Sequence, residues 1–118
     1  MIAVIFEVWP EEGRLDEYLA LAAELREELV TIDGFISVER FASIYEEGKL
    51  LSLSFWRDME AVTTWRRNLE HRKAQARGRR EIFRDYRLRV ADVIRDYGKH
   101  DRREEAPADL ASVACSAC

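Results

Sequence analysis

The sequence contains very little cysteine: two residues, both in the final "CSAC". Cys115 and Cys118 stand at the chain end without a second pair, so the two further ligands of a zinc site are missing. The rest of the chain has no cysteine, and we expect the fold to form without disulfides. We interpret the pair as part of a dispensable tail, with half of a zinc site or a redox pair as the alternative.

Long hydrophobic runs are also absent. The N-terminal stretch "MIAVIFEVWP" leads directly into glutamates, and it is apolar over only about eight residues, whereas a membrane span requires roughly 18. It lacks the basic region that opens a signal peptide. We therefore expect a cytoplasmic protein with no signal peptide and no membrane partner.

No strong excess of one charge is present. The net charge is −4 over 118 residues, of which 36% are charged and 47% hydrophobic. This composition is typical of one soluble globular domain. The stretch "WRRNLEHRKAQARGRR" (65–80) is locally basic, but on a helical wheel its cations spread around the helix instead of sharing the face that phosphate binding requires. We predict no nucleic-acid partner.

Hydrophobic periodicity indicates six elements. We predict strands at 2–9, 35–44, 49–57 and 84–97, and helices at 14–32 and from 59 to about 78. Gly34 suits a left-handed cap after the first helix, and Asp58 suits the N-cap of the second. We expect a bulge around Ala91–Asp92 in the last strand.

The order β-α-β-β-α-β predicts an α+β, ferredoxin-like fold. Such a fold has a four-stranded antiparallel sheet with both helices on one face. We assign residues 1–98 to this domain and residues 99–118 to a C-terminal tail, because the tail shows no periodicity.

The sheet face opposite to the helices is predicted to be apolar. A monomer with one solvated sheet face would show clean alternation of apolar and polar residues, and three strands do not. The predicted groups that share a face are Ile2, Val4, Phe6 and Val8; Ala3, Ile5 and Trp9; Phe35 and Phe41; and Leu51, Leu53 and Phe55. Because an exposed apolar face favours aggregation, we predict a homodimer through the sheet face. Coverage by helix ends, loops and the tail is the alternative.

The second predicted helix carries most of the candidate site. Its wheel has an apolar stripe toward the sheet and a neutral polar sector beside that stripe. The stripe contains Val62, Trp65, Leu69 and Ala76, and the polar sector contains Thr64, Asn68, His71 and Gln75. His71 titrates near neutrality and suits a base or a hydrogen-bond donor, with a structural polar role as the alternative. Trp9, Trp56 and Trp65 line an aromatic pocket in one interpretation and pack in the core in the other.

The element order and several motifs resemble the antibiotic biosynthesis monooxygenase (ABM) domain of the dimeric α/β-barrel superfamily. The matching motifs, within residues 2–98, are "DGF", "FW", Trp65 with His71, "AQARGR" and "YRLRVADVIRDY". The resemblance implies a dimeric barrel and a pocket between sheet and helices for a small hydrophobic or aromatic ligand. Some members oxygenate anthrones or quinols with neither metal nor flavin. A deprotonated phenol can pass an electron to oxygen itself, so the protein supplies an apolar pocket, hydrogen bonds and exclusion of water.

The resemblance also assigns site residues. Trp65 matches the family's pocket tryptophan, and Asn68, His71 and Gln75 would border that pocket. We predict His71 and Trp65 as catalytic residues and Asn68, Gln75 and Trp56 as substrate-binding residues, with no metal and no cofactor.

Haem-degrading members of the superfamily use three residues: an asparagine on the first strand, the tryptophan of the second helix, and a histidine about ten residues after it as iron ligand. Trp65 matches the tryptophan, but this chain has Glu7 and Gln75 at the other two positions. The resemblance therefore does not favour haem degradation. We predict a cofactor-independent monooxygenase that oxidises a small aromatic or quinol-type substrate with O2. The alternatives are a non-enzymatic dimeric small-molecule-binding or stress-response protein, and a haem-binding or haem-degrading protein.

Overall fold

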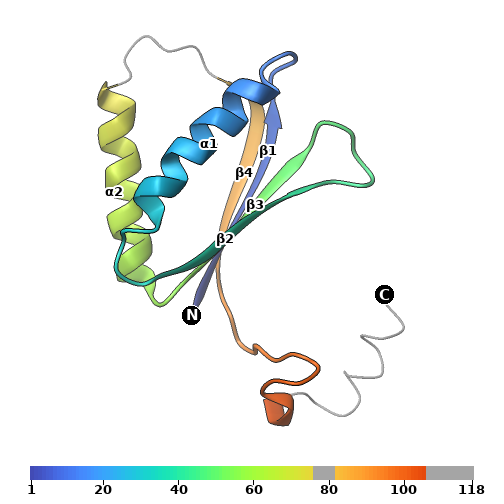
Figure 1. Cartoon of the computed structure of the whole chain (residues 1–118), viewed down its shortest axis with the longest axis vertical. Helices are drawn as coiled ribbons and strands as arrows, with labels where there is room; N and C mark the ends of the chain where they lie inside the picture. Colours follow the sequence, from blue (N-terminus) through green and yellow to red (C-terminus); the bar gives the residue numbers. More distant parts are fainter. Residues whose placement is uncertain (76–81, 106–118) are drawn as a thin grey trace.

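The computed structural model of the chain describes residues 1–75 and 82–105, and on the second helix it describes side chains up to Leu69. The elements are β1 (Ile2–Pro10), α1 (Leu15–Leu29), β2 (Phe35–Ala42), β3 (Leu50–Trp56), α2 (Met59–Gln75), β4 (Phe83–Asp92) and the short 3-10 helix η1 (Arg103–Glu105). The predicted ferredoxin-like fold is confirmed. The sheet is antiparallel, has the order β2-β3-β1-β4 and carries both helices on one side (Figure 1).

The last strand is shorter than predicted. β4 ends at Asp92 instead of residue 97, because its neighbour β1 begins at Ile2 and offers no further strand residues to pair with. The bulge predicted at Ala91–Asp92 is also wrong, since both residues pair regularly with β1. The register shift lies at the other end of this pair, between Trp9 and Pro10, where proline has no amide hydrogen to donate to the ladder.

Four further boundaries differ from the prediction or stay predictions. α1 ends at Leu29 and β2 at Ala42, each a few residues earlier than predicted. The predicted helix end near residue 78 lies outside the described residues, as do both cysteines. The domain boundary at residue 98 stays a prediction.

The two predicted turn signals have different outcomes. Asp58 caps α2 as predicted, because its Oδ1 accepts a hydrogen bond from the Ala61 amide at 3.0 Å. Gly34 has the predicted positive φ, at 93°. It does not cap α1, however, because Val30 occupies the C-cap in a right-handed conformation. Gly34 instead shapes the connection into β2, where a Cβ on it would lie 2.8 Å from the Ala61 Cβ.

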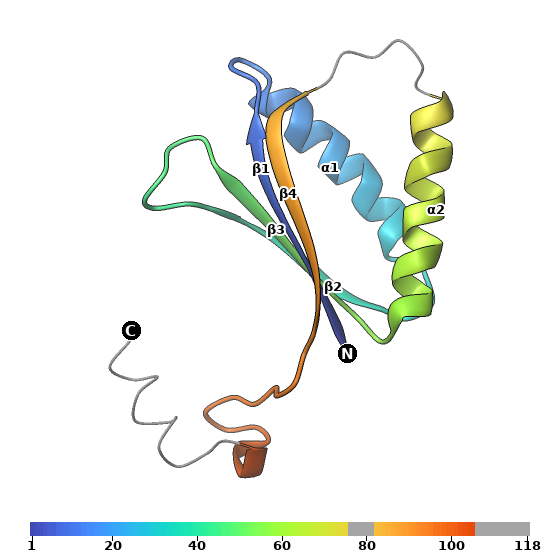
Figure 2. The same ribbon diagram turned by 180° about the vertical axis from the view of Figure 1, so that it is seen from behind.

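The hydrophobic core lies between the sheet and the facing ends of the two helices. Its buried members are Ile2, Leu29, Val38, Trp56, Ala61 and Val62, with Val4, Ile32, Phe35 and Trp65 packed against them. Burying a large aliphatic side chain stabilises a fold by about 1.5–3 kcal/mol, so this cluster holds α2 onto the sheet. Figure 2 shows the same layers from behind, with the sheet on one side and α1 and α2 on the other.

The sheet has an inner face, toward the helices, and an outer face. β1 directs Val4, Phe6 and Val8 inward and Ile5 and Glu7 outward, and β3 directs Leu51, Leu53 and Phe55 outward, as predicted. The predicted shared face of Phe35 and Phe41 is wrong. Ile36 is an extra residue in the pairing of β2 with β3, so Phe35 points inward against Trp56 while Phe41 lies on the outer face. Within residues 1–75 and 82–105, no helix is both long and apolar enough to cross a membrane.

Candidate functional site

The N-terminal half of α2 is fixed on the sheet by its predicted apolar stripe. The Asp58 cap starts the helix, Ala61 and Val62 are buried, and Trp65 packs against the core while keeping part of its surface accessible. Leu69 is half-buried on the same stripe. This confirms the predicted orientation of α2 and places Trp65 at the border between the core and the space beyond it.

The polar sector of α2 is described in part. Asn68 is exposed, which agrees with a position beside the buried stripe. His71 and Gln75 belong to the helical backbone of α2, but their side chains lie outside the description. Their assignment as catalytic and substrate-binding residues therefore stays a prediction that depends on the helical spacing from Trp65.

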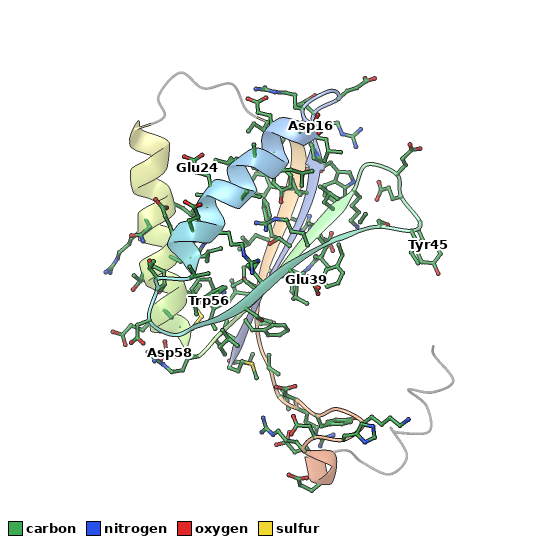
Figure 3. The ribbon with its side chains drawn as sticks, viewed as in Figure 1. Asp16, Glu24, Glu39, Tyr45, Trp56 and Asp58 are labelled. Atoms are coloured by element: carbon green, nitrogen blue, oxygen red, sulfur yellow. The ribbon has the colours of Figure 1, made fainter. Side chains whose placement is uncertain are left out.

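Trp56 is placed differently from Trp65. It is 1% exposed, stacks edge-on against Phe35 and donates its indole N–H to Ser54 Oγ at 2.9 Å. Figure 3 shows Trp56 between the sheet and the helices. This burial favours the core interpretation of Trp56 and speaks against its predicted contact with a substrate.

Four aromatic rings meet on the inner face where β1, α1 and β4 converge. Phe6 lies 5.8 Å from Phe83 and 5.8 Å from Tyr86 between ring centroids. Tyr18 of α1 lies 5.6 Å from Phe83, edge to face. Edge-to-face and tilted pairs of this kind stabilise each other beyond their buried area. The cluster therefore forms a rigid aromatic wall at one end of the inner face.

An accessible apolar strip extends from this wall along β4. Val4, Phe6 and Val8 of β1 pair with Val90, Leu88 and Tyr86, respectively. The three β4 residues share the inner face, yet they are 40%, 51% and 59% exposed. We call Val4, Phe6, Tyr86, Leu88 and Val90 the inner strip. Apolar side chains on the helix side of a sheet are normally buried, so the strip offers a surface for an apolar ligand.

Tyr86 is the single member of the inner strip that has a hydrogen-bonding side chain. Its amide bonds to the Asp85 carboxylate at 2.8 Å, and within the described residues no hydrogen bond occupies its hydroxyl. A tyrosine hydroxyl can donate and accept. The strip thus combines an apolar surface with one polar contact, which is a common arrangement in small-molecule sites.

Three of the resolved pKa shifts belong to Asp33, Arg57 and Asp58, beside the start of α2 and away from this strip. The Arg57 guanidinium binds Asp33 and lowers the pKa of that carboxyl. The hydrogen bond from the Ala61 amide, together with Arg57, lowers the pKa of Asp58. These carboxylates are exposed and anchor the start of the helix. Among the described residues, no three metal-ligating side chains of His, Cys, Asp or Glu cluster together.

The inner strip was missed at the level of sequence. Tyr86, Leu88 and Val90 alternate on β4, which is a visible strand signal. Their partners on β1 are distant in the sequence. Only the strand register shows that the β1 and β4 residues lie on the inner face of the sheet, the face toward Trp65.

Comparison with known proteins gives the family. The family model described as "Antibiotic biosynthesis monooxygenase" matches residues 1–77. The chain belongs to the antibiotic biosynthesis monooxygenase (ABM) family. It is 47% identical over 93 residues to the jasmonate monooxygenase ABM of Pyricularia oryzae. The aligned region covers 79% of this chain and 43% of that protein. The chain spans about half the length of the curated relatives it matches.

Solved structures of this family's fold are also similar. One is Rv0793 of Mycobacterium tuberculosis, with a TM-score of 0.68, 18% identity, and coverage of 82% of this chain and 98% of that one. Another is the haem-degrader MhuD of the same organism, solved with two haems in its active site. Its TM-score is 0.64 at 19% identity, covering 83% of this chain and all of that one. At these identities the likeness shows the fold alone.

Proposed function

We propose that this ABM-family protein is a monooxygenase that oxidises a small, mainly apolar substrate with O2 on the inner strip. The accessible apolar residues of β4 on the helix side of the sheet carry this proposal. Membership in the family and the similarity to a named monooxygenase support the reaction class.

We further propose that the reaction is cofactor-independent. An electron-rich substrate such as a quinol or an anthrone, once deprotonated, reduces oxygen directly, so the protein needs to supply water exclusion and placed hydrogen bonds. Trp65 lines the substrate site from α2 and orients the substrate, and His71 serves as the base or hydrogen-bond donor. Asn68 and Gln75 supply further polar contacts, and Tyr86 supplies one from the opposite side.

The named relative suggests a second substrate class. Its name implies action on jasmonate, a ring-bearing carboxylic acid with a large apolar part. A substrate panel for this chain should therefore hold anthrones and hydroquinones in one group and jasmonic acid in the other.

Oxygen consumption tests the proposal. Purified protein should consume O2 above the buffer rate with at least one compound of the panel. Trp65→Phe and His71→Ala should lower the rate about 10- to 100-fold, as loss of a positioning or proton-transfer group does. Absence of uptake with every compound, in a folded protein, would contradict the proposal.

A pair of matched variants tests the inner strip. Tyr86→Phe removes the hydroxyl on the strip, and Tyr45→Phe removes a hydroxyl at the β2–β3 hairpin tip, where Tyr45 is almost fully exposed (Figure 3). We expect Tyr86→Phe to raise KM or lower kcat and Tyr45→Phe to leave both unchanged. Equal behaviour of the two variants would remove Tyr86 from the site.

Two other functions remain as alternatives with direct tests. Binding of panel compounds without oxygen consumption would favour a non-enzymatic binding or stress-response protein.

A Soret shift on haem titration that disappears in His71→Ala would favour haem binding, for which the fold similarity to MhuD is the supporting observation. Glu7, the first-strand position compared with the haem-degraders, lies on the outer face with its carboxylate held by Lys49 and Arg89. This placement does not favour the haem alternative.

We also propose that the protein is a homodimer formed through the outer face. Ile5, Leu51, Leu53 and Phe55 occupy this face at the centre of the sheet without a helix over them. An apolar sheet face of this kind is stable in water when a second copy covers it. Sedimentation should give a dimer at micromolar concentration, and Leu53→Asp should give a monomer, while Ile44→Asp at the exposed hairpin tip should not. A monomeric wild-type protein would refute this proposal.

A further inference from the structure

Strand pairing divides the inner face of the sheet into rows that contain one residue from each strand. Listed from β2 to β4, the rows are Ala42, Leu50, Val8 and Tyr86; Arg40, Ser52, Phe6 and Leu88; Val38, Ser54, Val4 and Val90; and Phe35, Trp56, Ile2 and Asp92. Three of these rows are interrupted by buried side chains, namely Val8, Val38, Ser54, Trp56 and Ile2. In the row of Arg40 every member keeps part of its surface accessible. We call Arg40, Ser52, Phe6 and Leu88 the open row.

The open row combines an apolar half with a polar half. Phe6 and Leu88 belong to the inner strip, and Leu88 is 51% exposed. Ser52 and Arg40 extend this strip across β3 to β2. Because neighbouring strands lie about 4.8 Å apart, the row covers about 14 Å from β4 to β2. The row is therefore an accessible surface of small-molecule length that is apolar at one end and cationic at the other.

Arg40 has no partner for its guanidinium within the part of the chain that the structure describes. Its Nε is a buried donor without an acceptor. Glu39, the nearest carboxylate along the chain, lies on the outer face because it pairs with Leu53. Buried donors without acceptors are rare and destabilising. Arg40 is therefore suited to an acceptor that comes from outside the chain.

We propose that the open row binds a small apolar carboxylic acid, with its carboxylate on Arg40 and Ser52 and its apolar part on Phe6 and Leu88. This inference rests on the function proposed above and names the class of substrate. A guanidinium can donate two parallel N–H bonds to the oxygens of one carboxylate, and the Ser52 hydroxyl adds a third donor. We expect the guanidinium to turn toward the acid, so that Nε and one Nη donate together.

Charge favours a monoanion over a neutral ligand or a phosphate. A neutral ligand would remove water from Arg40 without supplying a counter-charge, which is costly. A phosphate monoester carries nearly two negative charges at neutral pH, whereas the open row supplies one cation. The adjacent Arg26 is engaged elsewhere, because its Nη1 donates to the Val38 carbonyl at 3.3 Å.

Binding of acids and of their primary amides tests the charge requirement. The probes are jasmonic acid, octanoic acid and naphthylacetic acid, each beside its amide, which is similar in size but neutral. Calorimetry gives the Kd without requiring any reaction. The wild type should bind at least one acid about tenfold more tightly than its amide, because charge-assisted hydrogen bonds are roughly twice as strong as neutral ones. Equal Kd values within each pair, or no binding of any acid, would overturn the proposal.

Variants of Arg40 test the residue itself. Arg40→Gln should raise the Kd of the acid by at least about tenfold and leave the Kd of the amide unchanged. Arg40→Lys keeps the charge but loses the bidentate geometry, so its Kd should lie between the two. The matched control is Arg66→Gln, which removes an exposed arginine from α2 and should change neither Kd. Equal losses for acid and amide in Arg40→Gln would indicate a structural role and contradict the proposal.

Ser52→Ala provides a second variant that keeps the charge of the open row. It should raise the Kd of the acid about three- to tenfold, since one hydrogen bond to a charged group is lost. Circular dichroism of each variant checks that the domain is folded. An unchanged Kd of the acid in folded Ser52→Ala would remove Ser52 from the carboxylate site.

These measurements separate binding of the acid from oxidation. Binding that depends on Arg40, without oxygen consumption, would support the open row and contradict the proposed monooxygenase. Oxygen consumption with a hydroquinone, while no acid binds, would overturn the open row and leave the monooxygenase standing. Oxygen consumption with a bound acid, with a higher KM and an unchanged kcat in Arg40→Gln, would support both.

Discussion

Arg57 binds both carboxylate oxygens of Asp33, with donor–acceptor distances of 3.2 Å for each. The same guanidinium donates through Nε to Asp58 at 3.0 Å, and Asp58 in turn caps α2. The connection after α1 and the first turn of α2 are therefore joined by one cation between two carboxylates. All three side chains are accessible to solvent, so salt and pH change the strength of these ion pairs.

The first prediction concerns the pH dependence of this network. Arg57 lowers the pKa of Asp33 in the folded state, so the folded protein favours the ionised carboxylate. The resulting stability is present above the unfolded pKa of about 3.9 and is lost as the pH falls through the folded value. We expect Asp33→Asn to lower the urea midpoint at pH 7, with a difference from wild type that disappears toward pH 2.

Two controls accompany this measurement. Glu47→Gln, at the exposed hairpin, should track the wild type at every pH. The effect of Asp33→Asn should also shrink in about 1 M salt, where the Debye length is only about 3 Å. A difference that stayed constant from pH 7 to pH 2 would show that the charge of Asp33 is not its cause.

The second prediction concerns Gly34. Both Gly34 and Gly48 have positive φ, at 93° and 85°, but an added Cβ meets the Ala61 Cβ at 2.8 Å in the first case and open space in the second. We expect Gly48→Ala to cost about 1 kcal/mol of unfolding free energy through backbone strain. Gly34→Ala should cost about 1–3 kcal/mol more through overpacking.

Denaturant unfolding of both variants checks this difference. The double variant Gly34→Ala/Ala61→Gly should recover a measurable part of the loss, because it removes the clashing methyl group while keeping the backbone strain. Equal losses in Gly34→Ala and Gly48→Ala would mean that the close approach to α2 has no energetic consequence.

The third prediction separates a core role from a ligand role for Trp56. Trp56→Phe removes a buried indole and its hydrogen bond to Ser54, and we expect a loss of about 2–4 kcal/mol in unfolding free energy. Ser54→Ala leaves the buried indole N–H without its acceptor and should cost about 1–3 kcal/mol. Urea titrations measure both. A changed KM together with unchanged stability would instead support the predicted substrate contact.

Much of the fold could be predicted because local pattern and tertiary packing agree. The apolar stripe around Trp65, the cap at Asp58 and the two-sided apolar character of β1 are visible in short windows of sequence, and the structure places them as expected. The end of β4 could not be predicted in this way. It depends on where β1 begins, and Ile2 is distant from Asp92 along the chain.

The candidate site was less predictable than the fold. The helical spacing correctly placed Trp65 on the stripe that packs against the core, while its role in the site stays a prediction. Composition and periodicity could not separate Trp65 from Trp56, which is more deeply buried. The wall formed by Phe6, Phe83 and Tyr86 was missed because its members come from opposite ends of the domain. Their proximity is a property of sheet register, which a single sequence does not encode locally.

The extra residue Ile36 in β2 has a consequence for how this chain tolerates deletions. Phe35 and Val38 both point into the core although three positions separate them, which regular alternation along a strand does not allow. Removal of Ile36 would bring Phe35, Ser37, Val38 and Glu39 into regular alternation and leave each of them on its present face. Substitutions at position 36 should also be largely neutral, since its side chain is exposed. Relatives of this chain should therefore differ at this position both in residue type and in whether the residue is present.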